Sequence, residues 1–315
     1  MVWAPTWIGT GSPACWPYDA CAAILANAGH EPSMDRLDIA RPGWAGRIQL
    51  RYGADMGRTR LESARHEGPL RIQKALYPEG PEVCQHILLH PPGGLVAGDS
   101  LDIDVELGTH ARVQLTTPGA GKWYRGDGRM ARQSLRCRVH AGAVLEWLPQ
   151  ESILFEGTSA ELEVRVELDD DAIFFGWDML CLGRRGSGEA FRHGVVRIST
   201  EIERGGRCLW WERGHIEGGG SQLDAPAVLA GQPVSASFLC AADAVDRLDN
   251  AWLADCRRLR PAVGEGAMTR LPGLIVARYL GTDARAAHAY FVSLWQRLRP
   301  AVAGREALPP RIWAT

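Results

Sequence analysis

The sequence lacks an excess of charge of either sign, and it lacks long apolar runs. Its 315 residues carry 35 Lys and Arg against 37 Asp and Glu, for a formal net charge of -2. Because a domain that binds nucleic acid is normally strongly basic, this balance predicts no nucleic-acid partner. No stretch approaches the roughly 18–20 uninterrupted apolar residues of a transmembrane helix, so no membrane partner is predicted either.

The sequence is also poor in cysteine motifs and in targeting signals. Its 8 cysteines include no C-x-x-C pair, the spacing that is typical of zinc knuckles and thiol redox motifs. A chain of this length needs no disulfide framework to stabilise its core, so free thiols in a reducing cytosol are expected. Residues 1–35 contain no Lys or Arg, and the charged n-region of a signal peptide is therefore missing. Together these absences predict a cytoplasmic protein.

Catalytic and metal-binding motifs are absent as well. The glycine-rich stretch 93–100 has the spacing of a Walker A loop, but Asp99 stands where the phosphate-binding lysine should be. His86 and His90 flank an apolar run before two prolines, which favours an extended segment that separates them by about 13 Å, too far to share one metal ion. Neither an H-E-x-x-H nor a G-x-S-x-G motif occurs. The residues alone therefore predict no catalytic site.

What the sequence does contain is a long series of β patterns. Residues 101–107 and 162–168 alternate strictly between apolar and polar, as half-buried strands do. Shorter patterns of this kind lie at 113–117, 135–139, 145–148 and 195–202. Strands follow strands without helices between them, which favours an antiparallel sandwich or a coiled sheet over a βαβ fold.

Two helices are predicted towards the C-terminus. Apolar residues recur at helical spacing over 245–259, where Pro261 would end the helix, and over 287–298, where Pro300 would end it. The N-terminal region is different, because it is rich in Ala, Pro, Gly and Trp and shows no sustained periodicity. We expect residues 1–42 to be a disordered extension and residues 43–315 to form a single domain. Met34 stands where a shorter form of the chain could begin.

A series of ordered motifs resembles the urease accessory protein D family, also called UreD or UreH. The resemblance extends from about residue 43 to residue 315. The motifs that carry it are 68–74 (GPLRIQK), 77–80 (YPEG), 88–99 (LLHPPGGLVAGD), 116–125 (TTPGAGKWYR), 145–151 (LEWLPQE), 177–178 (WD), 182–184 (LGR), 188–191 (GEAF) and 310–315 (PRIWAT).

The resemblance implies a non-enzymatic scaffold that helps to load nickel into urease. Members of this family have a helical β-sandwich of many strands with two helices, so a mainly β fold is expected. They work with accessory protein F, the GTPase accessory protein G and the nickel carrier E. By this resemblance the chain would dock on apo-urease and on protein F, which carries protein G. It would pass transient Ni²⁺ through an internal tunnel, with no permanently bound cofactor.

The resemblance also implies which residues line the tunnel. The polar tunnel positions of the family fall on Asp99, Asp178 and Glu212, and Glu151 and Glu189 are weaker candidates. Nickel held by several imidazoles or thiolates would leave slowly, whereas spaced carboxylates bind the ion weakly enough to release it. This sequence departs from the family at Gly121, where a Ser or Thr normally precedes the lysine of Lys-Trp-Tyr-Arg.

Other interpretations of these residues remain open. Asp99 follows a glycine and could be a turn residue that binds nearby backbone. Asp178 and Glu212 could form structural ion pairs with arginines. They could also be the acid and base of a β-sandwich hydrolase, whose chemistry needs only two carboxyl groups at a suitable separation. A plain binding module without metal traffic is the third alternative for the function.

Overall fold

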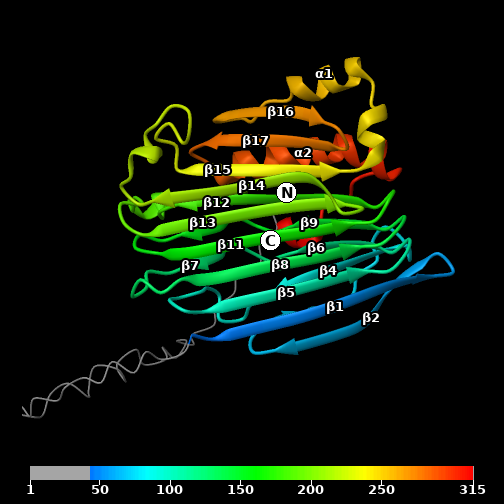
Figure 1. Ribbon diagram of the computed structural model, residues 1–315, viewed down its shortest axis with the longest axis horizontal. Coiled ribbons are helices and arrows are strands. Elements are labelled where there is room, and N and C mark those ends of the chain that lie inside the picture. Colours follow the sequence, from blue (N-terminus) through cyan, green and yellow to red (C-terminus); the bar gives the residue numbers. More distant parts are fainter. Residues whose placement is uncertain (1–42, 315) are drawn as a thin grey trace, which may run out of the picture. The chain divides into compact units, whose positions relative to one another are not determined.

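The computed structural model describes residues 43–314, and the expected N-terminal extension of residues 1–42 lies outside this range. The described part consists of two β-sheets and a layer of helices (Figure 1). The seven-stranded sheet has the order β14-β13-β11-β8-β5-β1-β2. Its strands are β1 (Ala45–Asp55), β2 (Arg58–Glu67), β5 (Ser100–Leu107), β8 (Ala131–Val139), β11 (Ser159–Leu168), β13 (Val195–Arg204) and β14 (Arg207–Glu217).

The second sheet has ten strands, of which eight follow the order β16-β17-β15-β12-β9-β6-β4-β3, while β10 pairs with β12 and β7. Its strands are β3 (Arg71–Ile72), β4 (Val83–Leu89), β6 (Arg112–Thr116), β7 (Gly121–Trp123), β9 (Val144–Leu148), β10 (Ser152–Leu154), β12 (Ile173–Leu182), β15 (Val234–Ala241), β16 (Glu265–Leu271) and β17 (Leu274–Gly281). The helices are α1 (Asn250–Arg258) and α2 (Ala284–Ala303), with short 3-10 turns η2 (Arg185–Ser187), η3 (Ser221–Leu223), η4 (Asp243–Arg247) and η5 (Arg311–Ala314).

The chain coils between the two sheets. Strands β5, β8, β11 and β13 lie in the seven-stranded sheet, and the strands that alternate with them in sequence, β4, β6, β9 and β12, lie in the other. Because each turn of the coil returns to the same sheet in the same direction, neighbouring strands pair in parallel. The coiled alternative is thus confirmed. Antiparallel pairing is found at β1–β2, β3–β4 and β13–β14, and through β12, β15, β17 and β16.

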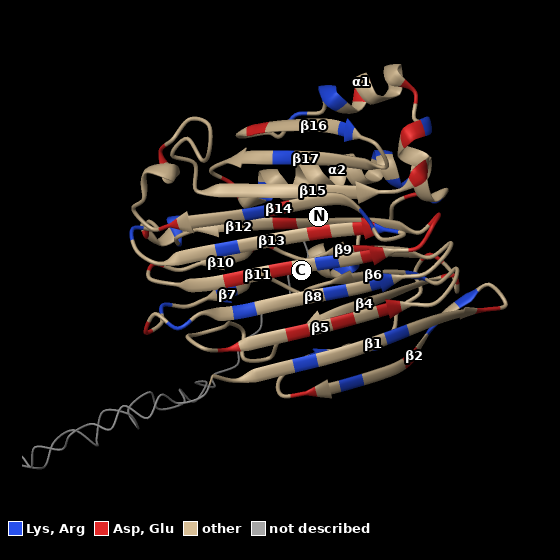
Figure 2. Cartoon of the chain, viewed as in Figure 1, with Lys and Arg blue, Asp and Glu red and all other residues tan. Residues whose placement is uncertain are grey.

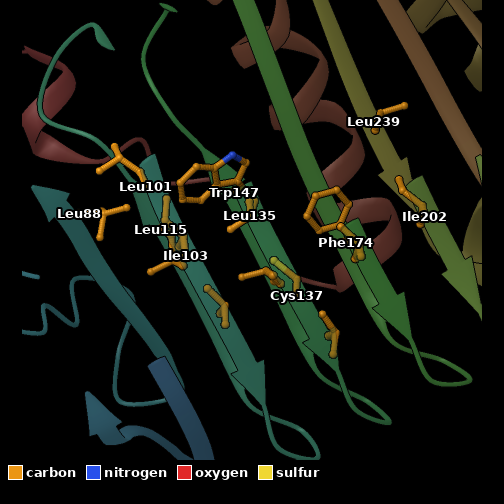
Figure 3. Close-up of a cluster of buried hydrophobic side chains, with 14 of the residues drawn as sticks. Leu88, Leu101, Ile103, Leu115, Leu135, Cys137, Trp147, Phe174, Ile202 and Leu239 are labelled. Atoms are coloured by element: carbon orange, nitrogen blue, oxygen red, sulfur yellow. The ribbon is translucent and has the colours of Figure 1, made fainter. Parts of the chain in front are cut away.

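Two apolar cores follow from the alternation of the strands. The inward side chains of both sheets form the first core, which Figure 3 shows with Ile103, Leu135, Trp147 and Phe174 among its members. The opposite face of the ten-stranded sheet packs against the helices and forms the second core. Strand β12 contributes to both cores, which explains why its sequence is apolar almost throughout instead of alternating.

The two predicted helices exist, but their bounds differ from the prediction. The stripe over 245–259 is divided, because Leu248 is extended and Asp249 caps a new helix by accepting hydrogen bonds from the N–H groups of Ala251 and Trp252. Helix α2 continues through Pro300 to Ala303 and ends at Gly304, whose left-handed backbone closes the last turn. The predicted end at Pro300 was therefore wrong: the missing N–H removes one hydrogen bond, and the N–H of Gly304 still bonds to the Pro300 carbonyl at 3.1 Å. Within residues 43–314 neither helix is long and apolar enough to cross a bilayer.

Candidate functional site

A pocket lies between the two sheets. It is a pocket of about 350 Å³ whose walls come from the inner faces of both sheets. Its lining includes Leu101, Ile103, Trp147 and Phe174 of the core drawn in Figure 3. Polar side chains also line it, among them those of His90, Lys122, Gln150, Asp178, Thr200 and Ser237.

Asp178 reaches this pocket because of the alternation of β12. Its neighbours Trp177 and Met179 belong to the core beneath the helices, so Asp178 faces the opposite way, between the sheets. In the register of the ten-stranded sheet, Asp178 lies opposite Ser237 of β15, and Ser237 lies opposite Arg278 of β17. Since side chains opposite each other in a sheet share a face, these three form a polar row on the inner face.

Glu212 approaches this row from the facing sheet. It lies opposite Thr200 in the register of β13 and β14, and Thr200 lines the pocket. Its Oε1 is 2.8 Å from Nη2 of Arg278, and Nη1 of Arg278 donates a hydrogen bond to the hydroxyl of Ser237. The guanidinium also lies over the Trp210 ring, with Cζ 5.6 Å from its centroid. Two sheets and four strands therefore contribute to one polar cluster.

The charges of this cluster are not balanced. Burial raises the pKa of the Asp178 carboxyl to about 7, and the negative charge of Glu212 acts in the same direction. The positive charge of Arg278 and a hydrogen bond with the Ser237 backbone oppose the shift. Asp178 therefore lacks the full compensation that Glu212 receives from its direct ion pair. When ionised, the Asp178 carboxylate therefore carries a negative charge that the protein only partly neutralises.

Asp99 does not join this cluster. It stands just before β5, where Oδ1 accepts a hydrogen bond from the Trp44 N–H at 2.8 Å and Oδ2 accepts one from the Val96 N–H at 2.9 Å. It does not line the pocket between the sheets. These contacts are those of a turn residue that closes the loop into β5, as the turn interpretation of the sequence expects.

Gly121 lines the pocket, at the start of β7. A Cβ atom at this position would lie 3.7 Å from the Ser152 hydroxyl and 3.9 Å from Nε1 of Trp123, which are ordinary contact distances. The site thus has room for the Ser or Thr that the resemblance implies at this position. The buried indole N–H of Trp123 has no hydrogen-bond partner in the described part of the chain, which is what a missing hydroxyl would leave behind.

The two weaker candidates lie apart from the pocket. Glu151 lines a separate surface cleft together with Lys122, Cys181 and Arg184. Glu189 accepts hydrogen bonds from the Arg184 guanidinium, at 2.6 Å from Nη2, and from the Glu156 N–H at 2.9 Å. The Arg184 hydrogen bonds are the main reason why the pKa of Glu189 falls to about 2. Its contacts are those of a structural ion pair that holds the loop after β12.

Sequence reasoning missed Arg278 and Ser237. A weak signal for Arg278 exists, because it is the single charged residue in the apolar strand sequence LIVARYLG of β17. Within residues 43–314 there is no group of three or more His, Cys, Asp and Glu side chains that could hold a metal ion. Asp178 and Glu212 together offer two carboxylates, and an ion bound there would need water or backbone oxygens as further ligands.

Comparison with known proteins places these observations in a family. A family model described as "UreD urease accessory protein" matches residues 45–314. The chain is 50% identical over 279 residues to the "Urease accessory protein UreD" of Azoarcus sp. (strain BH72), which covers 89% of this chain and 97% of that protein. It is 51% identical over 275 residues to the protein of the same name from Pseudomonas aeruginosa, covering 87% and 96%. It is 45% identical over 280 residues to that of Nitrosococcus oceani, covering 89% and 93%.

Proposed function

Because the chain belongs to the UreD family of urease accessory proteins, we propose that it is a cytoplasmic urease-maturation scaffold that conducts Ni²⁺ between its two sheets. Membership of the family shows that the chain is an accessory protein of urease maturation and nickel insertion, and that it is not an enzyme. It sets aside the hydrolase alternative for Asp178 and Glu212. The proposal adds the route of the ion and the partners.

The cluster of Asp178 and Glu212 is the observation that supports the route. Asp178 lines the pocket, and Glu212 of β14 lies opposite Thr200, which also lines it. Carboxylate oxygens bind Ni²⁺ less tightly than several imidazoles or thiolates would, so an ion can enter and leave. When Asp178 is ionised, its negative charge compensates part of the desolvation of a divalent cation inside the protein. Asp99 lies outside the pocket and stays a prediction of the resemblance.

The proposed partners follow from the family. In this proposal the chain docks on apo-urease and binds accessory protein F, which carries the GTPase accessory protein G. Ni²⁺ enters from the side of the GTPase and leaves towards the urease active site. Co-purification of the full chain with accessory proteins F and G and with apo-urease from the native host tests this part. Recovery of the chain without any of the three contradicts it.

Substitution of the two carboxylates tests the route. Asp178→Asn and Glu212→Gln keep the shape of each side chain and remove its charge. We expect both variants to assemble with the partners as the wild type does, and to lower the nickel content of urease measured by metal analysis. Glu201→Gln is the matched control, because Glu201 lies on β13 opposite Trp211, on the other face from Glu212. Normal nickel loading of urease by both Asp178→Asn and Glu212→Gln would refute the route while leaving the family assignment intact.

A further inference from the structure

Arg278 binds Glu212 directly and lies in the same polar row as Asp178. Its strand is otherwise apolar, and its inward neighbours Val276 and Leu280 belong to the core between the sheets or pack against it. An arginine in such a row loses hydration and needs compensating contacts. Its two partners, Glu212 and the Ser237 hydroxyl, both lie in the polar cluster.

The contacts of Arg278 determine the charge that a cation meets. With both carboxylates ionised, Asp178, Glu212 and Arg278 sum to one negative charge. A divalent ion between the two carboxylates would then lie next to a guanidinium that binds one of them at 2.8 Å. Like charges at such separations repel strongly in a protein interior, so the ion and the guanidinium compete for the same oxygen atoms.

The guanidinium is placed so that it can leave. The Arg278 side chain is 41% exposed and that of Glu212 is 23% exposed, so the arginine is the more accessible member of the pair. Long basic side chains keep their stems packed while the charged head moves into solvent. The ring of Trp210, 5.6 Å from Cζ, offers the head a second favourable contact.

We propose that Arg278 is a displaceable counter-ion of the nickel path: it neutralises Glu212 while the path is empty, and an entering divalent cation must displace it. This inference rests on the proposed function, since it concerns the same ion and the same two carboxylates. The competition lowers the affinity of the site for Ni²⁺ and speeds release. An ion pair with a purely structural role would instead leave the affinity for Ni²⁺ unchanged when the arginine is replaced.

Nickel binding to the full chain tests the proposal directly. We expect Arg278→Gln to bind Ni²⁺ more tightly by about tenfold or more, because one unit charge some 6 Å from a divalent ion already costs about tenfold at the dielectric constant of water. Equilibrium dialysis against Ni²⁺ measures the affinity, and a chelator chase measures slower release. Arg213→Gln is the matched control, because it removes the same charge from the outward face of β14, where Arg213 stacks on Trp211 at 4.9 Å. Equal or weaker binding by Arg278→Gln would overturn the proposal.

A second variant decides the matter if Arg278→Gln does not fold. Arg278→Lys keeps the charge but loses the fork that reaches Glu212 and Ser237 together. We expect its affinity for Ni²⁺ to lie between those of the wild type and Arg278→Gln, and an affinity equal to or below the wild type overturns the proposal. Failure of the proposed function has a different signature. In that case Asp178→Asn and Glu212→Gln load urease normally, whatever Arg278 does to binding.

Discussion

Two clusters, each made of one arginine and two carboxylates, lie on opposite faces of the ten-stranded sheet. Beneath helix α2, Nε of Arg299 is 2.6 Å from Oε1 of Glu146, and Nη1 is 2.6 Å from Oε2 of Glu79. Gln114 and Gln85 each donate a further hydrogen bond to these carboxylates, at 2.9 Å. All three charged side chains are at most 7% exposed. Between the sheets, Arg278 binds Glu212 directly but leaves Asp178 without a salt bridge, and it is 41% exposed.

The difference between the clusters is the one expected between a structural cluster and the exchangeable cation site proposed above. The Arg299 cluster is dry, and all four carboxylate oxygens of Glu79 and Glu146 have donors, so removing any member leaves a buried charge or dipole unpaired. The Arg278 cluster leaves Asp178 without a salt bridge to Arg278, and Asp178 and Ser237 line a pocket, which is what the proposed displacement by a cation requires. One arginine and two carboxylates thus form a fully paired buried cluster in one place and a partly exposed, incompletely paired cluster in the other. Four substitutions test this contrast.

The largest effect is expected at Arg299. Arg299→Met keeps the volume of the side chain but leaves Glu79 and Glu146 buried without their counter-charge. Breaking a buried pair in this way costs about 3–5 kcal/mol, so we expect the free energy of unfolding in urea to fall by that amount. Arg197→Gln on the exposed face of β13 is the control and should change stability by less than about 0.5 kcal/mol. A loss below about 1 kcal/mol for Arg299→Met would mean that the Arg299 cluster does not stabilise the fold.

The second effect is a pH dependence that arises from Asp178. Its pKa is about 7 in the folded chain, above the usual value near 3.9 of an unfolded chain. Between these values the folded chain binds more protons than the unfolded chain, so the contribution of Asp178 to stability falls as pH rises from about 4 to about 7. Asp178→Asn removes this contribution. We expect the stability of the variant relative to the wild type to be greater at pH 8 than at pH 5, by roughly 2–3 kcal/mol in urea unfolding. A stability difference between Asp178→Asn and the wild type that is the same at both pH values would contradict the raised pKa of Asp178.

The two clusters also show what the sequence could and could not predict. Strands β5 and β11 were predicted closely, because the alternation that defines them is local and each has one wet face. The coiling of the chain was left open between two alternatives, since strand direction is not visible in an alternating pattern. The path of α2 through Pro300 could not be predicted, because Arg299 is anchored by Glu79 and Glu146, which lie far away in the sequence.

The candidate site was predicted in part for the same reason. Asp178 and Glu212 were identified from the family motifs, and the structure does bring these two together with Arg278. The row of Asp178, Ser237 and Arg278 depends on the register of three strands that are distant in the chain, and no local pattern encodes it. The contacts of Glu189, a motif residue, are those of an ion pair with Arg184.

The third prediction concerns the pocket side of the sheet, where hydrogen bonding is incomplete. Gly121→Ser would place a hydroxyl within reach of the unpartnered indole N–H of Trp123. We expect a stabilisation of about 1 kcal/mol, the usual gain from one buried hydrogen bond. Thermal unfolding should shift upward by about 2 °C for a domain of this size. Gly119→Ser is the control, because a Cβ at Gly119 has no atom within 4 Å and gains no buried partner. Equal shifts for both variants would show that the effect is one of backbone entropy.

The smallest effect is expected on the outer face of the seven-stranded sheet, where Figure 2 shows basic bands on β1 and β8 beside acidic bands on β5 and β11. Arg136 of β8 binds both Asp102 and Asp104 at 3.0 Å, so it too is one arginine with two carboxylates, but it is 46% exposed. Exposed pairs contribute less than about 1 kcal/mol, and Arg136→Gln should lower the free energy of unfolding by no more than that. Raising the salt to about 1 M shortens the screening length to about 3 Å and should abolish the difference. The loss caused by Arg299→Met should persist in the same buffer, because salt does not reach a pair that is 2% exposed. If salt reduced the loss of unfolding free energy equally for both variants, burial would not be what distinguishes the Arg299 cluster beneath α2 from the ion pairs on the surface.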